Sequence, residues 1–160
     1  MRILILLLVF TLTIVSCQNA VQNLEVKSPN KYVSIVFGTT EQGKPYYVTS
    51  FRQNTVIDTS YLGFEFTNAK QLLSGLEIIN SNRSVTIETW QMPWGEQLDV
   101  TNNYTQLQVE LQELNAPKRK VNIVFKVYDD GIGFRYEFPE QKGWTEALIK
   151  DEHTEFNLTE

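Results

Sequence analysis

The sequence predicts an all-β fold, an antiparallel β-sandwich. Apolar and polar residues alternate with a period of two along most of the chain, helical periodicity is almost absent, and turn residues separate the alternating runs. Each alternating run is expected to turn one face toward a core and the other toward solvent. About seven short strands without a long helix are typical of two packed sheets.

The expected strands share an alternation of apolar and polar side chains. In chain order they are Val33 to Phe37, Tyr46 to Arg52, Thr55 to Thr67, Val85 to Thr89, Leu107 to Leu111, Val121 to Val127 and Ile132 to Phe138. The last two are joined by Asp129-Asp130-Gly131, which predicts a hairpin in which Gly131 adopts a positive φ. Residues 69–74 are expected to form one helical turn that Ser74-Gly75 ends.

The N-terminus has the pattern of a bacterial lipoprotein signal. Arg2 precedes an apolar run from Ile3 to Val15, which is too short for a comfortable membrane span and suits a signal peptide. The run ends at Ser16-Cys17, so residues 1–17 are predicted to be the signal and 18–160 the domain. Cys17 would then be lipidated and tether the domain to a membrane in the periplasm or at the outer membrane. The alternative is an ordinary signal cleaved after Ala20, with Cys17 discarded.

Composition excludes some partners and some chemistry. The net charge is −5, and a negative chain lacks the cations that displace phosphate counterions, so nucleic acid is not an expected partner. The one basic patch, Lys118-Arg119-Lys120, follows Pro117 and is expected to form a solvated turn. Cys17 is the only cysteine, which rules out an intramolecular disulfide.

No catalytic or metal site is predicted for this chain. His153 is the only histidine, so neither a histidine-rich metal site nor a Cys–His pair can be assembled, and a surface position is expected for it. Adjacent carboxylates occur at Asp129-Asp130 and at Asp151-Glu152. Two carboxylates suffice for glycoside hydrolysis, but 19 acidic residues give close pairs by chance.

The segment Glu88 to Glu96 holds two of the three tryptophans, on either side of Pro93. An indole face beside carboxylates can bind a sugar, because the ring stacks on the apolar face of a pyranose and the acids accept its hydroxyls. Trp90 continues the alternation of Val85 to Thr89 and is predicted to lie in the core. Trp94 and Glu96, beyond the proline, are the candidate contacts to a carbohydrate or a neighbouring domain. The alternative is that both tryptophans are core residues.

An ordered series of motifs resembles the N-terminal domain of glycoside hydrolase family 97, the α-glucosidases and α-galactosidases of Bacteroidetes. The series covers essentially all of residues 24–156; Met92, where the family has a different apolar residue, is a mild departure. The motifs are Ser28 to Asn30, Leu62 to Glu65, Glu88 to Glu96, Asn102 to Tyr104, Tyr128 to Pro139 and Lys150 to His153.

The resemblance implies a β-super-sandwich that precedes a (β/α)8 catalytic barrel and a small C-terminal β domain, with calcium near the active site. It also implies an exo-acting enzyme on α-linked oligosaccharides. The family's catalytic and calcium-ligating residues would lie beyond Glu160, so none is assigned here, and the sandwich is expected to be incomplete toward its C-terminal end.

Three roles are compatible with these patterns. In the first, the domain braces the barrel and walls the sugar pocket. In the second, it is a free-standing, lipid-anchored module that binds carbohydrate or acts as a scaffold. In the third, an immunoglobulin-like adhesion domain, the sequons at Asn82, Asn103 and Asn157 would be glycosylated, a reading that the lipoprotein signal disfavours.

Overall fold

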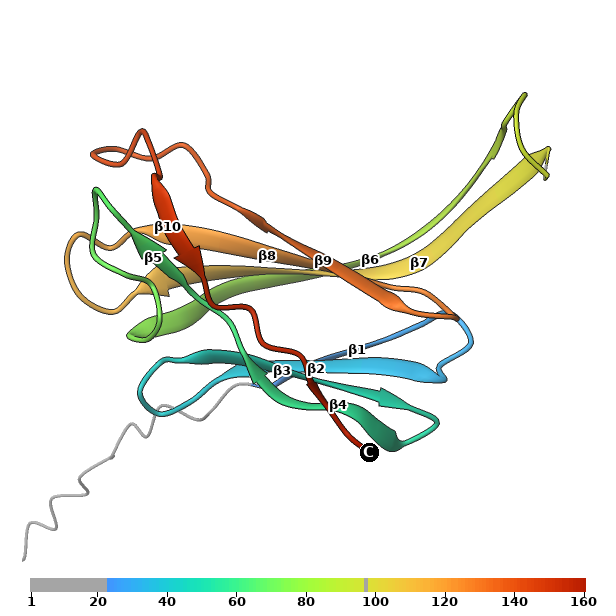
Figure 1. Ribbon diagram of the computed structural model, residues 1–160, viewed down its shortest axis with the longest axis horizontal. Helices are drawn as coiled ribbons and strands as arrows, with labels where there is room; N and C mark the ends of the chain where they lie inside the picture. The colour runs from blue at the N-terminus through green and yellow to red at the C-terminus, as the bar shows by residue number, and fades with distance from the viewer. Residues whose placement is uncertain (1–22, 97) are drawn as a thin grey trace, which may run out of the picture.

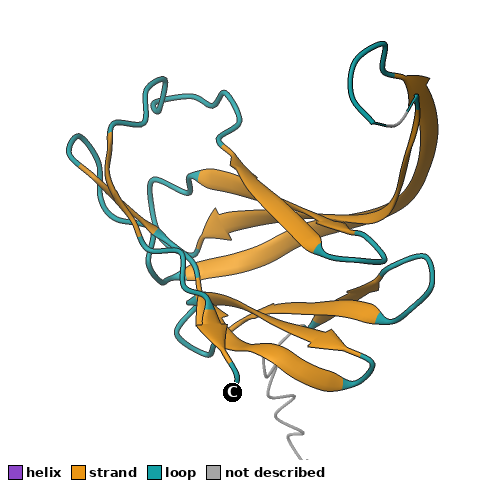
Figure 2. Ribbon diagram, turned by 45° about the vertical axis from the view of Figure 1, so that its right-hand side comes forward, coloured by secondary structure: helices purple, strands orange, loops and turns teal. Residues whose placement is uncertain are grey.

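The computed structural model describes residues 23–96 and 98–160, and every regular element in them is a β-strand (Figure 2). The strands are β1 (Leu24–Lys27), β2 (Val33–Thr39), β3 (Pro45–Phe51), β4 (Asn54–Tyr61), β5 (Phe64–Phe66), β6 (Leu76–Gln91), β7 (Asp99–Glu113), β8 (Lys120–Val127), β9 (Ile132–Glu137), β10 (Ile149–Glu152) and β11 (Asn157–Leu158). The predicted all-β class is confirmed.

The strands form three antiparallel sheets. One has the order β1-β2-β3-β4-β11, and a second has the order β6-β7-β8-β9. These two sheets face each other as the layers of a sandwich (Figure 1). The third sheet pairs β5 with β10 and lies at the end opposite the long β6–β7 hairpin.

The core lies between the two large sheets, where the alternating strands turn their apolar faces. Ile35, Phe37 and Tyr47 of the first sheet are completely buried, as are Leu107 and Phe125 of the second. The ring centroids of Phe37 and Phe125 lie 5.5 Å apart across the interface. Burial of large apolar side chains is the main stabilising term in such a core.

Aromatic rings close the end of the sandwich near β5. The Phe64 ring lies 4.6 Å from that of Tyr136 and 5.2 Å from that of Phe138. Trp144 meets Phe66 edge to face, with ring centroids 5.4 Å apart. Such tilted and edge-to-face pairs are the favoured aromatic geometry.

Two sequence predictions for residues 55–74 are wrong. The single strand expected from Thr55 to Thr67 is divided into β4 and β5, which belong to different sheets. A β-carbon at Gly63 would come 2.8 Å from the Leu72 carbonyl oxygen, so the chain passes itself closely at this break. The expected helical turn at 69–74 does not form, because Leu72 is buried and bonds to Phe64 in an extended bridge.

The predicted β8–β9 hairpin is confirmed, with Val127 paired to Ile132. Its turn differs from the expectation, since Gly131 does not adopt a positive φ. The connection has four residues and is closed by a 2.8 Å bond from the Tyr128 amide to the Gly131 carbonyl. Asp129 accepts a 2.8 Å hydrogen bond from the Asn30 amide, which links this turn to the turn after β1.

Arg119 is buried, so the predicted solvated turn at residues 118–120 is wrong for its central residue. Its guanidinium donates to both carboxylate oxygens of Glu113, at 2.9 and 2.8 Å, and to the Lys70 carbonyl at 2.6 Å. It also lies 4.9 Å from the centre of the Trp144 ring. Lys118 and Lys120 are exposed as expected.

The pair also shifts the pKa of its acid. Burial alone would raise the pKa of Glu113, but the hydrogen bonds and the charge of Arg119 outweigh it and hold the pKa below 4.5. The stability from this pair is therefore fully present above pH about 4.5 and is lost as the pH falls through the lowered pKa of the folded state.

Replacing Glu113 with Gln is expected to destabilise the domain by about 3–5 kcal/mol, because the buried Arg119 loses its counter-charge. Urea unfolding at neutral pH measures the loss. Lys120→Gln, an exposed neighbour, is the matched control and should stay within about 0.5 kcal/mol of the parent. The Glu113→Gln domain should also lose less stability on acidification; equal stability of both variants would refute the role assigned to the pair.

Candidate functional site

A long hairpin arm extends beyond the body of the domain (Figure 1). β6 and β7 have 16 and 15 residues, whereas β2 and β3 in the opposite sheet have 7 each. We define the arm as residues 84–96 and 98–106, from the Ser84–Gln106 pair through the Gln91–Asp99 pair to the described part of the connecting loop. Eight paired positions in extended conformation reach roughly 25 Å.

Neither face of the arm lies against the first sheet. Leu107 is fully buried, but Val85 and Ile87, on the same face farther out, are 67% and 70% exposed. Arg83 marks the boundary, because its Nε donates a 3.0 Å hydrogen bond to the Glu25 carbonyl of β1. Beyond this contact the alternation of β6 continues without a partner layer.

Trp90 is 44% exposed, so its prediction as a core residue is wrong. It pairs with Val100 near the outer end of the arm, past the last contact with the first sheet. The face on which it lies also carries Tyr104 and is the outer face of the β6–β9 sheet. This face is concave, because the arm bends away from the first sheet (Figures 1 and 2).

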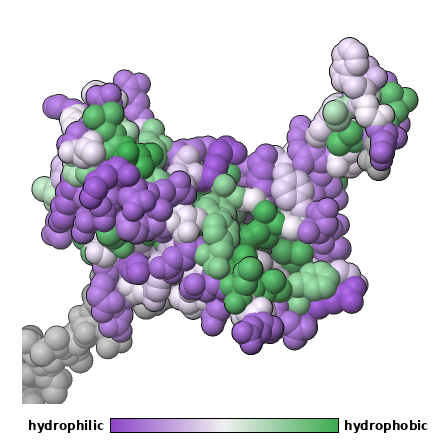
Figure 3. Space-filling view, viewed as in Figure 1, coloured by the Kyte–Doolittle hydropathy of each residue, from purple (hydrophilic) through white to green (hydrophobic). Residues whose placement is uncertain are grey.

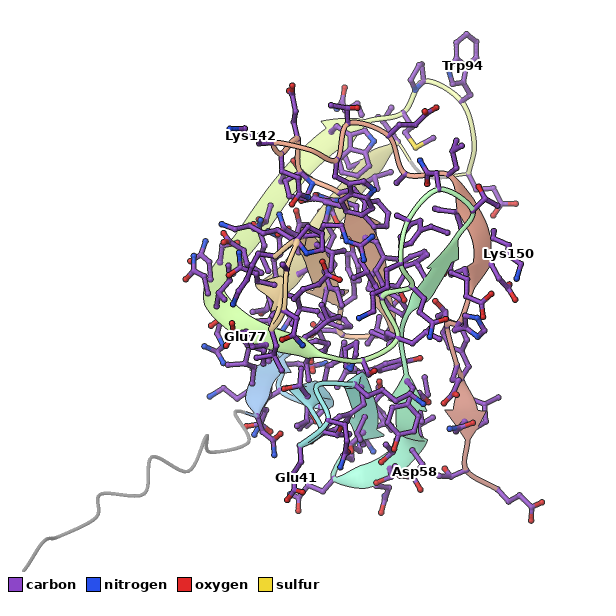
Figure 4. The ribbon with its side chains drawn as sticks, turned by 90° about the vertical axis from the view of Figure 1, so that its left-hand side faces the viewer. Glu41, Asp58, Glu77, Trp94, Lys142 and Lys150 are labelled. Atoms are coloured by element: carbon purple, nitrogen blue, oxygen red, sulfur yellow. The ribbon has the colours of Figure 1, made fainter. Side chains whose placement is uncertain are left out.

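The tip of the arm carries the two predicted contact residues. Trp94 is 79% exposed and projects at one extremity of the molecule, far from Glu41 and Asp58 (Figure 4). Glu96 is also exposed. The loop is closed by a 2.8 Å bond from the Met92 amide to the Leu98 carbonyl. Contact of Trp94 and Glu96 with carbohydrate or another domain stays a prediction.

The outer face at the base of the arm is polar and ordered by side-chain contacts. Asn102 donates a 2.5 Å hydrogen bond to the Glu88 carboxylate on the neighbouring strand. The rings of Tyr104 and Tyr128 lie 5.3 Å apart, and the Lys126 ammonium sits 4.2 Å from the Tyr104 centroid. A hydrogen bond with the Thr86 side chain, followed by one with Lys126, lowers the pKa of Tyr104.

The arm is acidic. The sequence has no Lys, Arg or His between residues 84 and 117, whereas Glu88, Glu96 and Asp99 lie in the arm. An acidic surface with exposed apolar side chains suits a neutral or basic partner and disfavours an anionic one.

A second exposed apolar surface lies where the two large sheets open toward the viewer of Figure 3. It is a groove of about 380 Å³, and its apolar lining is Ile57, Ile132, Phe134, Tyr136 and Phe156. Phe156 and the nearby Leu158 are 59% and 73% exposed. Apolar area of this kind marks an interaction surface.

Two carboxylates outside the arm have structural contacts. Glu65 lies 3.0 Å from Lys150 and 3.3 Å from His153, and its hydrogen bond with Lys150 lowers its pKa. His153 is partly exposed, as expected of a surface residue. The Asp129 carboxylate accepts the hydrogen bond from the Asn30 backbone amide, so it stabilises the turn between β8 and β9.

In residues 23–96 and 98–160, no three His, Cys, Asp or Glu side chains form a group that could hold a metal ion. The same residues contain no helix long and apolar enough to cross a membrane. Cys17 and the predicted signal lie outside the described residues.

The fold and the arm define a β-sandwich domain with a protruding β-hairpin. The family model for the glycosyl-hydrolase 97 N-terminal domain matches residues 26–160. The chain therefore belongs to glycoside hydrolase family 97, as an N-terminal domain of its enzymes, and the predicted resemblance is confirmed.

Solved structures agree with this assignment. A family 97 enzyme from Pseudoalteromonas sp. strain K8, solved with panose and with acarbose, is 34% identical, with a TM-score of 0.79 over 84% of this chain and 20% of that enzyme. A β-arabinopyranosidase, 22% identical, shares the fold with a TM-score of 0.78 over 86% of this chain and 22% of its own. The chain thus spans about one fifth of these relatives.

The three tryptophans are expected to differ in their effect on stability. Trp90→Ala and Trp94→Ala should each leave the melting temperature nearly unchanged, because both side chains lie on the uncovered arm. Trp144→Ala should cost about 3–5 kcal/mol, since this ring packs on Phe66, Phe138 and Arg119. Thermal unfolding followed by circular dichroism compares the melting temperatures of the three variants. A large decrease with Trp90→Ala would show that Trp90 is a core residue.

Proposed function

We propose that this domain is the non-catalytic N-terminal part of an exo-acting α-glycosidase, an α-glucosidase or α-galactosidase. In that enzyme it braces a (β/α)8 barrel and forms one wall of the sugar pocket. The observation that carries the proposal is the uncovered arm with Trp94 at its tip, in a chain that belongs to family 97.

The exposed side chains of the tip support docking on another domain. Met92, Trp94 and Leu98 are 42%, 79% and 59% exposed. A single Trp can bury about 150–250 Å² on contact, which makes it a strong anchor at an interface. Glu96 beside it can accept hydrogen bonds from sugar hydroxyls or from the barrel.

The apolar groove supports the bracing role. The groove is lined by Phe134 and Phe156 and adjoins the exposed Leu158, so a neighbouring domain seated there would remove this area from water. The groove and the arm are separate surfaces, and two separated contacts would fix the orientation of the barrel.

An α-linked oligosaccharide is the proposed ligand of the whole enzyme. The support is that the Pseudoalteromonas relative was solved with panose and with acarbose. The calcium of the full-length enzyme would be held by residues beyond Glu160.

The competing role is a free-standing, lipid-anchored carbohydrate-binding or scaffolding module. The DNA downstream of codon 160 distinguishes the two. An open frame that encodes a barrel supports the enzyme, and a stop codon leaves a truncated remnant or the module.

The docking role is tested in the full-length enzyme. Trp94→Ala is expected to raise KM for an α-glycoside or weaken association of the barrel with this domain, because the anchor at the tip is lost. Steady-state kinetics with p-nitrophenyl α-glucoside and α-galactoside measure the effect. Glu41→Ala, in an exposed turn far from the tip, is the matched control (Figure 4).

The chain of 160 residues alone provides a second control for the docking test. It should hydrolyse neither substrate above a buffer blank, because the acid and base of glycoside hydrolysis are predicted to lie in the barrel. Hydrolysis by the purified chain, or kinetics of Trp94→Ala equal to those of the parent enzyme, would contradict the proposal.

We also propose that Cys17 is lipidated and holds the protein at a membrane in the periplasm or at the outer membrane. Metabolic labelling with a palmitate analogue should tag the parent, whereas Cys17→Ala should be unlabelled and either released or left as precursor. Ser16→Ala, which keeps a small residue before the cysteine, is the matched control. Equal, unlabelled secretion of all forms would establish an ordinary signal peptide.

A further inference from the structure

The register of the arm places three kinds of side chain on one concave face. Trp90 pairs with Val100, Glu88 pairs with Asn102, and the next pair on this face contains Tyr104. Residues in directly paired positions project to the same face, and alternate positions on a strand are about 7 Å apart. An indole, an acid–amide pair and a tyrosine therefore follow one another along the face.

Trp90 provides an available ring. It is 44% exposed, and no aromatic ring of residues 23–96 or 98–160 stacks on it. The strand holds its backbone through the pairing with Val100, so the indole is presented from a β-ladder and not from a loop. Such a ring can stack on the apolar face of a pyranose.

Glu88 and Asn102 supply polar groups beside the ring. Their 2.5 Å hydrogen bond uses one N–H of the amide and one carboxylate oxygen. The second N–H of Asn102, its carbonyl oxygen and the second oxygen of Glu88 stay available as donor and acceptors. Because the bond orients both groups, less conformational entropy is lost when a ligand binds.

The charges near the face bear on the ligand class. Glu88, Glu96 and Asp99 lie in the arm, and the Lys126 ammonium lies 4.2 Å from the Tyr104 ring at its base, so the face has no uniform charge that would hold an ion. A neutral ligand with many hydroxyl donors satisfies the acceptors without depending on charge. An oligosaccharide with uncharged pyranose rings has both the apolar ring face and the hydroxyls.

We infer that the concave face of the arm is a binding surface for a neutral α-linked glucose oligosaccharide. Trp90 stacks on one sugar ring, and Glu88 with Asn102 hydrogen-bonds the hydroxyls of the adjacent unit. The inference deepens the proposed function by giving the domain a direct sugar contact, on residues distinct from the Trp94 tip that docks the barrel. The binding does not require the barrel.

The same sheet contains a matched control. Asn80 donates to Glu110 at 3.4 Å in another cross-strand acid–amide pair on the outer face. The residue that pairs with Glu110 on the other neighbouring strand is Asn122, so no tryptophan adjoins this pair. Changing Glu110 therefore removes a similar acid without touching the inferred site.

The three tryptophans allow a direct test by nuclear magnetic resonance. The indole N–H signals of the ¹⁵N-labelled chain are assigned with Trp90→Phe and Trp94→Phe and followed during titration with maltotriose. The Trp90 signal is expected to shift saturably, with a Kd of about 1–10 mM, while the Trp144 signal stays in place. Glu88→Gln and Trp90→Ala should each weaken binding about tenfold or more, and Glu110→Gln should not.

Each other outcome overturns the inference. Absence of a Trp90 shift at saturating sugar, or unchanged affinity in Trp90→Ala, shows that this face does not bind the sugar. A shift confined to Trp94 places the sugar at the tip, and an equal shift with a lysine-rich peptide in place of maltotriose identifies a charge-driven surface. None of these results decides the docking proposal, because that proposal is tested separately by the kinetics of Trp94→Ala in the full-length enzyme.

Discussion

The facing sheets differ in strand length, and this difference determines which part of β6 and β7 is covered by the first sheet. The first sheet, with strands of up to 8 residues, covers only the inner half of β6 and β7. An isolated two-stranded hairpin is marginally stable in water, so the arm depends on its continuity with the covered part. The pairing of Thr105 with Val127 of β8 and the Arg83 contact to β1 anchor its base. The exposure of Val85 and Ile87 is a consequence of this geometry, whereas Trp90 lies on the outer face of its sheet, which the first sheet does not cover.

Alternation in the sequence predicted which side chains share a face but not what lies opposite that face. Val85 and Ile87 alternate as regularly as Leu107 and Val109, yet the first two are exposed and the last two are buried. Most of the longer strands, the β8–β9 hairpin and the family were therefore predictable, and the exposure of Val85 and Ile87 was not. Asn102 carries no signal of its own; its place beside Glu88 follows only from the register.

Arg119 shows a similar limit for charged residues. The sequence does not distinguish the three cations of Lys118-Arg119-Lys120, but only the Arg119 side chain is buried and forms an ion pair with Glu113. The available signal was the position of Glu113 and Arg119 on either side of a Pro117-containing turn, where hairpin strands bring opposite charges together. The β5–β10 pair had no comparable signal, because its strands are more than 80 residues apart and one of them has only three residues.

In the part of the chain that the structure describes, the outer edge of β6 has no neighbouring strand along the arm, since β6 is the terminal strand of its sheet. Long free edges invite strand-to-strand aggregation between molecules. Here the carboxylates Glu88, Glu96 and Asp99 share one sign, so two arms that approach edge to edge bring like charges together. The acidic composition of the arm therefore opposes strand-to-strand pairing between two molecules along this edge.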